Sequence, residues 1–261
     1  MTVRSSQESV RLSDGVAIPL IGFGTWQLDG DDAYNGVRAA LEIGYRHIDT
    51  ATAYANEDKV GAAVRDSGVG RENVFITTKC PPGNAGREAE TLDASLKALG
   101  VDFVDLWLVH WPPNGEAQPD TWKAFIEALE QGKTRAIGVS NYSLAQIDEL
   151  IAATGRAPAL NQIPWNPFAF NAREVAELQR REVVLEGYSP LKRTDLANPV
   201  LAEIAAAHNK TAAQVVLRWH VEHGFVVIPR SQRRERIEEN FALFDFELTQ
   251  EEREKLDTLG A

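Results

Sequence analysis

Four titratable side chains of different kinds stand at or near the ends of short apolar runs in the first half of the chain. Asp49 and Tyr54 lie in the segment GYRHIDTATAY, Lys79 closes FITTK, and His110 closes DLWLVH. A carboxylate, a phenol, an ammonium group and an imidazole can each give or take a proton. Because the three runs are candidates for successive buried strands, we expect the four groups to share one site.

Each of these residues alone also has an ordinary structural explanation. Asp49 could cap a helix, and Tyr54 could be a packed aromatic residue in a loop. Lys79 could be a solvated charge at a strand end, and His110 could be a satisfied histidine of the core. Their order along the chain, together with their flanking residues, favours the shared site.

The composition limits the kind of protein. The chain has 261 residues, 44% of them hydrophobic, which suffices for one large core, and we expect a single domain over residues 1–261. The net charge of −11, from 27 basic and 38 acidic residues, argues against a nucleic-acid partner. The single cysteine, Cys80, can form neither an internal disulfide nor a metal cluster. The polar start MTVRSSQESV is unlike a signal peptide, and no run approaches the roughly 18 apolar residues of a membrane span. We expect a cytoplasmic monomer without a metal.

Short apolar runs alternate with segments of helical period along the chain. Leu92, Leu96 and Leu99, for example, share one face of a predicted helix. Eight strands alternating with helices predict a parallel sheet closed into a (β/α)8 TIM barrel of the α/β class. The predicted strands are 20–24, 45–48, 73–77, 103–109, 135–139, 159–163, 182–186 and 225–229. The capping-box pattern predicts three helix starts, by Ser143 with Gln146, Thr211 with Gln214, and Thr249 with Glu252.

A doubly wound open sheet is the structural alternative. It would normally carry G-x-G-x-x-G after its first strand, and Gly22 and Gly24 do not match that spacing. The segment VRLSDGVAIPL predicts an N-terminal β-hairpin that turns at Asp14-Gly15 and could plug one end of the barrel. Two helices, near 199–208 and 249–259, are additional to the eightfold pattern.

Polar residues end seven of the eight predicted strands, and the segments around them are specific in combination. They are GFGTWQ, GYRHIDTATAY, TTK, LVHWP, GVSN, NQ, YSPL and IPRSQRRERIEENFALFDFELT. With them the chain resembles the aldo-keto reductases over almost its whole length. It is similar to their short prokaryotic branch, which includes the diketogluconate reductases.

The resemblance implies a catalytic tetrad of Asp49, Tyr54, Lys79 and His110, and reduction of aldehydes or ketones by hydride transfer from NADPH. Tyr54 is then the general acid. A phenol has an ordinary pKa of about 10, and a cation within about 4–6 Å lowers it, so we expect Lys79 to lower the pKa of Tyr54. Asp49 would hold Lys79 in place and charged. His110 would hydrogen-bond the carbonyl oxygen.

The resemblance also implies contacts with the nicotinamide end of the cofactor. Ser140, Asn141 and Gln162 match positions that hold the carboxamide, and amide side chains supply both donors and acceptors for it. Tyr188 matches the residue that stacks on the nicotinamide ring. Further cofactor contacts are expected from Ser189 and Leu191. The structural alternatives are a turn or N-cap role for Asn141 and a buried loop contact for Gln162.

The segment RSQRRER carries a charge of +3, from four arginines and one glutamate, in an acidic protein. It begins a predicted helix over 233–243, where free amide donors favour an anion. The resemblance implies that this segment grips the adenosine phosphate of NADPH through Arg230, Ser231 and Arg236, and the adenine through Glu239 and Asn240. A solvated helix face is the alternative for Arg233 and Arg234. The family usually has lysine at the position of Arg230, so we expect altered contact geometry there.

Two of the six tryptophans, Trp26 and Trp111, match aromatic walls of a substrate pocket, whereas Trp107, Trp122 and Trp219 are expected in the core. The expected substrate is a small aldehyde, ketone or keto-sugar. One alternative is an NADPH-binding barrel that acts as a sensor or regulatory subunit with little turnover. Another is a metal- or carboxylate-dependent hydrolase, which the scarcity of carboxylates and histidines at the strand ends disfavours.

Overall fold

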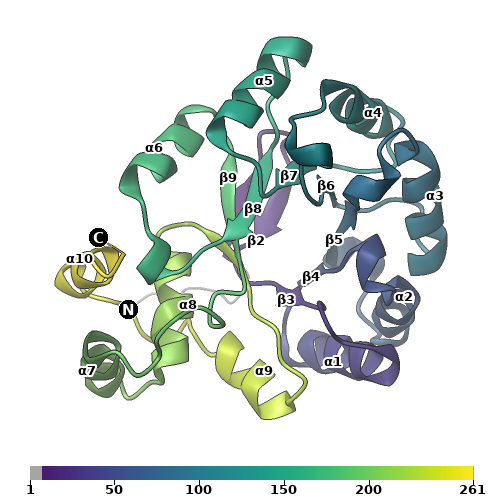
Figure 1. The fold of residues 1–261 in the computed structure, drawn as a ribbon. Helices are drawn as coiled ribbons and strands as arrows, with labels where there is room; N and C mark the ends of the chain where they lie inside the picture. The colour runs from purple at the N-terminus through teal and green to yellow at the C-terminus, as the bar shows by residue number, and fades with distance from the viewer. Residues whose placement is uncertain (1–7, 261) are drawn as a thin grey trace.

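The computed structural model describes residues 8–260, and within them the chain folds into a (β/α)8 barrel (Figure 1). Eight parallel strands pair in the order in which they occur in the chain. The first and last strands approach through a parallel bridge between Ile21 and Val227, and the Gly22 amide donates to the Val227 carbonyl at 2.9 Å. The sheet is therefore nearly closed. Its strands are β3 (Phe23–Gly24), β4 (His47–Asp49), β5 (Phe75–Cys80), β6 (Leu106–Val109), β7 (Ile137–Ser140), β8 (Leu160–Pro164), β9 (Val184–Tyr188) and β10 (Val226–Ile228).

All eight predicted strands are present, but each begins one to three residues later than predicted. Val74 and Val183, which precede β5 and β9, are buried although they lie outside the strands. The apolar run therefore starts where the chain enters the core, before the strand pairs with its neighbours.

Helices surround the sheet, and in the described chain each barrel strand is followed by at least one of them (Figure 1). Two helices are additional to one helix per strand: α7, which lies between β9 and α8, and α10, which follows α9. They confirm the two predicted additional helices and contact each other. The helices are α1 (Gly30–Ile43), α2 (Glu57–Asp66), α3 (Glu88–Leu99), α4 (Pro119–Glu130), α5 (Leu144–Thr154), α6 (Ala172–Arg180), α7 (Pro199–His208), α8 (Ala212–Glu222), α9 (Arg234–Phe241) and α10 (Gln250–Asp257).

The helix ends follow the local sequence signals. The three predicted capping boxes form, and they begin α5, α8 and α10. Gly100 and Gly155 end α3 and α5 in the left-handed conformation, which a residue without Cβ adopts at little cost. Local chemistry thus sets where these helices start and stop.

The predicted hairpin is also confirmed, as β1 (Ser9–Arg11) paired with β2 (Ala17–Pro19). Asp14 in its turn accepts a hydrogen bond from the Ile137 amide at 3.1 Å and forms an ion pair with Arg156. Because Ile137 begins β7, the hairpin covers the end of the barrel where the strands start. The opposite end, where the strands finish, stays open for a site.

Candidate active site

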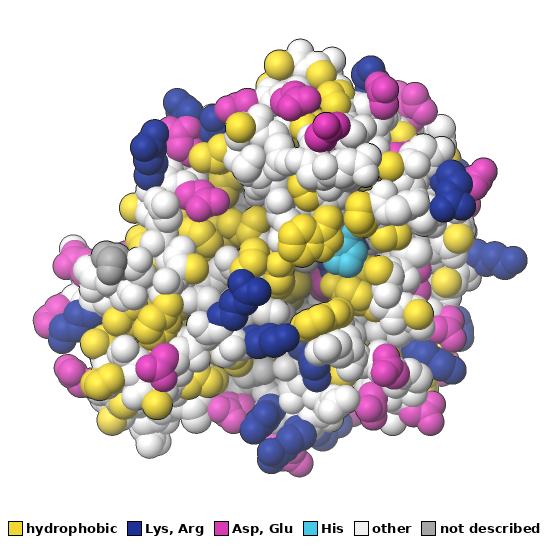
Figure 2. Space-filling view, in the orientation of Figure 1, with side chains coloured by type: hydrophobic (Ala, Val, Ile, Leu, Met, Phe, Trp, Pro, Cys, Tyr) yellow, Lys and Arg dark blue, Asp and Glu magenta, His cyan; other side chains and the backbone are white. Residues whose placement is uncertain are grey.

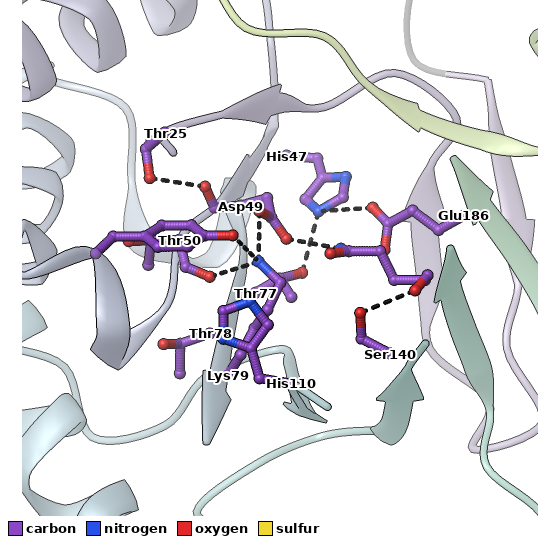
Figure 3. A network of polar contacts seen from close by, with 12 residues as sticks. Thr25, His47, Asp49, Thr50, Thr77, Thr78, Lys79, His110, Ser140 and Glu186 are labelled. Atoms are coloured by element: carbon purple, nitrogen blue, oxygen red, sulfur yellow. Dashed lines mark hydrogen bonds and ion pairs between the residues drawn. The ribbon is translucent and has the colours of Figure 1, made fainter. Parts of the chain in front are cut away.

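The carboxyl ends of three neighbouring strands bring the predicted tetrad together. Asp49 is the last residue of β4, Lys79 is the penultimate residue of β5, and His110 directly follows β6. Tyr54 lies on a single 3-10 turn, Thr52–Tyr54, shortly after β4. Figure 3 shows Asp49, Lys79 and His110 in this arrangement. The grouping of the four side chains that the sequence predicts is therefore present.

Lys79 is the centre of the group. Its Nζ donates to Asp49 Oδ1 at 2.6 Å, to the Thr50 carbonyl at 2.8 Å and to Tyr54 Oη at 3.4 Å. These contacts use the three donors of an ammonium group, and the side chain is 0% exposed. Burial alone would lower the pKa of Lys79, but Asp49 and Tyr54 outweigh it, so the pKa lies above its ordinary value. Lys79 is therefore a cation shielded from water.

The pKa of Tyr54 lies above its ordinary value, whereas the sequence led us to expect it below that value. Burial raises the pKa of Tyr54, and the Lys79 cation, although it acts in the opposite direction, does not cancel that effect. The expectation of a lowered pKa is thus wrong for the net value, because the hydration lost by a tyrosinate here exceeds what one ammonium group restores. At neutral pH the group is a phenol that has a proton to donate.

His110 faces Tyr54, with ring centres 5.6 Å apart and ring planes at 75°. Burial and the Lys79 cation lower the pKa of His110 to about 3. The imidazole is therefore neutral near pH 7 and carries one N–H donor. A neutral donor beside a phenol suits a carbonyl oxygen that gains negative charge.

Asn56, which the sequence analysis did not single out, anchors the loop that carries Tyr54. Its Nδ2 donates to the carbonyls of Thr25 and Leu28 at 3.0 and 2.9 Å. Its Oδ1 accepts from Thr50 Oγ1 at 2.8 Å. Since Thr50 also supplies a carbonyl to Lys79, Asn56 joins the loop after β3 to the tetrad.

The predicted nicotinamide contacts lie near the tetrad: Ser140 and Tyr188 end β7 and β9, and Gln162 lies within β8. Asn141 Nδ2 donates to Ser140 Oγ and to the His110 carbonyl, at 2.9 and 3.1 Å. Tyr188 Oη donates to Asn141 Oδ1 at 2.9 Å, which fixes the phenol ring at the site. Gln162 Nε2 lies 2.9 Å from Asp49 Oδ2. Asn141 is thus hydrogen-bonded on both sides of its amide, and a cofactor would use the remaining lone pair of its oxygen.

Two further predicted contacts follow β9. Ser189 adopts a positive φ of 51°, where the chain turns away from the strand. Leu191 is half-buried in the loop that follows and packs against the core. Their role as cofactor contacts stays a prediction.

The basic segment lies at the start of α9, whose first turn has no side-chain cap. Arg234 pairs with Glu42 at 2.8 Å and with Glu238 at 3.2 Å, which confirms a role on the helix surface. Arg236 forms no ion pair with a residue of the described chain, and Arg230 donates only to Gln27, at 3.1 Å. Both guanidinium groups therefore lack a carboxylate partner among the described residues, and they lie near helix amides that no side chain caps. Such groups offer the hydrogen-bond donors that a phosphate needs.

Three further predicted cofactor contacts, Ser231, Glu239 and Asn240, lie just before or within α9. Ser231, next to Arg230, is buried, and its Oγ accepts from the Arg233 amide at 3.0 Å. Of the predicted adenine contacts, Asn240 is buried, and Glu239 accepts from Thr211 Oγ1 at 2.6 Å. That hydrogen bond leaves one carboxylate oxygen of Glu239 for another partner.

The tryptophans divide as predicted. Trp26 and Trp111 are 41% and 48% exposed, whereas the three predicted core tryptophans are fully buried. Lys192 lies over the ring of Trp26, with its Nζ 4.7 Å from the ring centre. Figure 2 shows hydrophobic side chains around a histidine near the centre of one face, with basic side chains beside them. The centre of this face is therefore apolar, with basic side chains beside it.

The barrel interior also contains two buried polar residues, His47 and Glu186, that the sequence did not lead us to expect at the site. Side chains two residues apart in a strand point to the same face. His47 is two residues before Asp49, and Glu186 is two residues before Tyr188. That spacing was a signal in the sequence that both side chains face the interior of the barrel.

Residues 8–260 contain no group of three or more His, Cys, Asp or Glu side chains arranged to hold a metal ion. None of the helices in that range combines the length and the apolar character that crossing a membrane requires.

Comparison with known proteins identifies the family. A profile described as "Aldo/keto reductase family" matches residues 20–261. The glyoxal reductase of Bacillus subtilis (strain 168) is 41% identical over 261 residues, which cover 98% of this chain and 94% of the relative. The glycerol 2-dehydrogenase (NADP(+)) of Saccharomyces cerevisiae is 40% identical over 275 residues, or 93% of this chain and 88% of the relative. The crystal structure of an aldo/keto reductase from Brucella melitensis is 41% identical and matches with a TM-score of 0.94, over 97% of this chain and 98% of that chain. The chain therefore belongs to the aldo/keto reductase family and is an oxidoreductase of the carbonyl-reducing type.

Proposed function

We propose that this protein reduces aldehydes or ketones to alcohols with NADPH, and that Tyr54 is the acid of the reaction. The observation that carries the proposal is the 3.4 Å contact between Tyr54 Oη and the wholly buried Lys79 Nζ. A cation shielded from water acts strongly on a neighbouring oxygen, because neither solvent nor salt screens it.

NADPH, when bound, supplies a hydride to the carbonyl carbon. His110, being neutral, donates a hydrogen bond to the carbonyl oxygen and orients it. As negative charge develops on that oxygen, Tyr54 transfers its proton to it and becomes a tyrosinate. Lys79 stabilises the tyrosinate, and Asp49 with the Thr50 carbonyl holds Lys79 in position.

The cofactor assignment rests on the chemistry of the donors. Ser140, Asn141 and Gln162 would hold the carboxamide, and the ring of Tyr188, fixed through its hydroxyl, would lie against the nicotinamide. Arg230, Ser231 and Arg236 would hold the additional phosphate, with Glu239 and Asn240 toward the adenine. The name of the yeast relative, which specifies NADP(+), supports this choice.

The substrate is proposed to be a small aldehyde, ketone or keto-sugar. The exposed rings of Trp26 and Trp111 would form the walls of an open mouth. The name of the Bacillus subtilis relative, a glyoxal reductase, supports small carbonyl compounds. A panel of aldehydes, ketones and keto-sugars, assayed with NADPH and NADH side by side, would identify the preferred class and cofactor.

The test of the acid is Tyr54→Phe, with Tyr34→Phe as the matched control. Tyr34 lies on α1, and its hydroxyl donates to Asp66 far from the tetrad. We expect Tyr54→Phe to lower kcat by about 10²- to 10⁴-fold, the usual contribution of an acid, while the Kd for NADPH stays close to wild type. Full activity of Tyr54→Phe would refute the assignment. A wild-type protein that binds NADPH but reduces no carbonyl compound would point instead to a sensor or regulatory subunit.

The proposal also describes a single-domain, monomeric, cytoplasmic enzyme. Sedimentation velocity should show one chain per particle at micromolar concentration, and a larger species would contradict the monomer.

A further inference from the structure

A second layer of polar side chains lies beneath the tetrad, inside the barrel. It contains His47 from β4, Gln162 from β8 and Glu186 from β9, none more than 2% exposed. Figure 3 shows Glu186 and His47 on the far side of Asp49 from His110. The reaction proposed above assigns no role to Glu186.

One amide joins this layer to the tetrad. Gln162 and Glu186 are direct partners in the β8–β9 ladder. Gln162 Nε2 donates to Glu186 Oε2 at 3.0 Å and to Asp49 Oδ2 at 2.9 Å. Asp49 Oδ1 is bound to Lys79, so Gln162 holds the other oxygen of the same carboxylate. The plane of Asp49, and with it the position of Lys79, depends on where Gln162 is held.

No cation among residues 8–260 contacts Glu186 to balance a negative charge on it. Its Oε1 has no hydrogen-bond partner in the described chain and lies 3.9 Å from His47 Nε2. Burial, with a contribution from Lys79, lowers the pKa of His47 to about 3, so His47 is neutral. The other charged groups that act on Glu186 are Asp49 and Lys79, and its ladder partner in β10 is the apolar Val226. Burial and the charge of Asp49 raise the pKa of Glu186 to about 8.

We propose that Glu186 is a positioning residue for the reduction: as a neutral carboxylic acid it orients Gln162, which in turn orients Asp49 against Lys79. This inference rests on the proposed function. Ionisation of Glu186 would place a second anion beside the same amide and near Lys79. It would draw Gln162 toward β9 and weaken the field of Lys79 at Tyr54. Turnover should therefore decline as the pH rises through about 8.

The first test compares Glu186→Gln and Glu186→Leu, with Glu88→Gln as the control. Glu88 is another buried carboxyl group, but it binds Thr121 and the Gly86 amide away from this network. Glutamine at 186 keeps an acceptor for Gln162 and cannot ionise. We expect Glu186→Gln to remain active at pH 7 and to lose the decline in kcat above pH 8. Glu186→Leu, which leaves Gln162 without this acceptor, should lower kcat by about 10- to 100-fold through misplacement of the catalytic pair.

The second test needs no cofactor. A carboxyl group whose pKa is raised on folding binds more protons in the folded state than in the unfolded state between the two pKa values. The folded pKa is about 8 and the ordinary value is 4.5, so this contribution to stability is lost as the pH rises across that window. The melting temperature of the wild type should therefore fall relative to Glu186→Gln between pH 5 and pH 9. The carbonyl stretch of a buried acid in the infrared spectrum should disappear over the upper part of that range, and should be absent from Glu186→Gln.

Three results would overturn the inference. One is a Glu186→Gln variant with the same high-pH decline in kcat as the wild type. Another is a Glu186→Leu variant that is fully active. The third is an infrared spectrum that shows no protonated carboxyl group assignable to Glu186 at pH 7, which would refute the neutral acid even if Glu186→Leu failed to fold. A wild-type protein that reduces no carbonyl compound would instead refute the proposed function.

Discussion

Replacing Lys79 with methionine tests the proposed reaction at its electrostatic centre. Methionine keeps an unbranched side chain of similar length in the fully buried position and removes only the charge and its donors. At the observed 3.4 Å, and with an effective dielectric constant of about 20, an ammonium group attracts a tyrosinate oxygen by about 5 kcal/mol. Since about 1.4 kcal/mol corresponds to a factor of ten in rate, the complete loss would be about 10³-fold or slightly more. The transition state carries only part of this charge, so we expect kcat to fall by about 10²- to 10³-fold.

Lys79→Met will also lower stability, and that effect must be separated from catalysis. It leaves the buried carboxylate of Asp49 without its cation, and breaking a buried ion pair on one side typically costs about 3–5 kcal/mol of unfolding free energy. The double variant Asp49→Asn with Lys79→Met removes both charges. It should regain most of the stability in urea unfolding, while its kcat stays as low as that of the single variant.

The assay is the loss of reduced-nicotinamide absorbance with a small aldehyde, together with the Kd for NADPH from a fluorescence titration. Lys123→Met is the control, because Lys123 is 56% exposed and its one ion pair within residues 8–260 is with Asp120. If either folded variant that lacks Lys79 kept kcat within about threefold of wild type, a difference of less than 1 kcal/mol, the role of the cation would be refuted.

Two further predictions concern the phosphate site and the packing of the barrel. Arg236→Ala should raise the Kd for NADPH by about 10- to 100-fold, the value of a charge-assisted hydrogen bond, and leave the Kd for NADH nearly unchanged. An equal effect on both cofactors in fluorescence titrations would contradict contact with the additional phosphate. Gly61→Ala should lower the unfolding free energy by about 1–3 kcal/mol or more, because its Cβ would overlap the backbone carbonyl of Leu99 where α2 meets α3. Gly83→Ala, whose Cβ would meet nothing within 4 Å, is the control in urea unfolding, and equal stability of the two variants would contradict the close approach.

The fold could be predicted because its signals are local and repeated. The three capping boxes lie where the sequence predicts them, since each depends on a few neighbouring residues. The strand starts were predicted too early because burial and strand pairing are different conditions. Val74 and Val183 meet the first condition and not the second.

The grouping of the four side chains could be predicted from the sequence, but their pKa values could not. The tetrad follows from motifs at strand ends, which the parallel register brings to one side. The net pKa of Tyr54 does not follow, because its sign depends on how completely loops from distant parts of the chain exclude water. Glu186 shows the same limit: its spacing from Tyr188 places it inside the barrel. Only the structure reveals that no cation of the described chain contacts Glu186, and that burial outweighs the effect of Lys79 on its pKa.

In the proposed reaction, the burial of Lys79 and Asp49 serves catalysis more than stability. A buried ion pair contributes little net stability, because the loss of hydration offsets much of the attraction. The same burial strengthens the electrostatic attraction between the Lys79 cation and a tyrosinate at Tyr54. At 3.4 Å the attraction would be only about 1 kcal/mol in bulk water, against about 5 kcal/mol at an effective dielectric constant of about 20. A lysine placed on the rim would leave Tyr54 without most of that stabilisation. The interior of the barrel at the strand ends supplies both the exclusion of water and the three hydrogen-bond acceptors that keep Lys79 charged there.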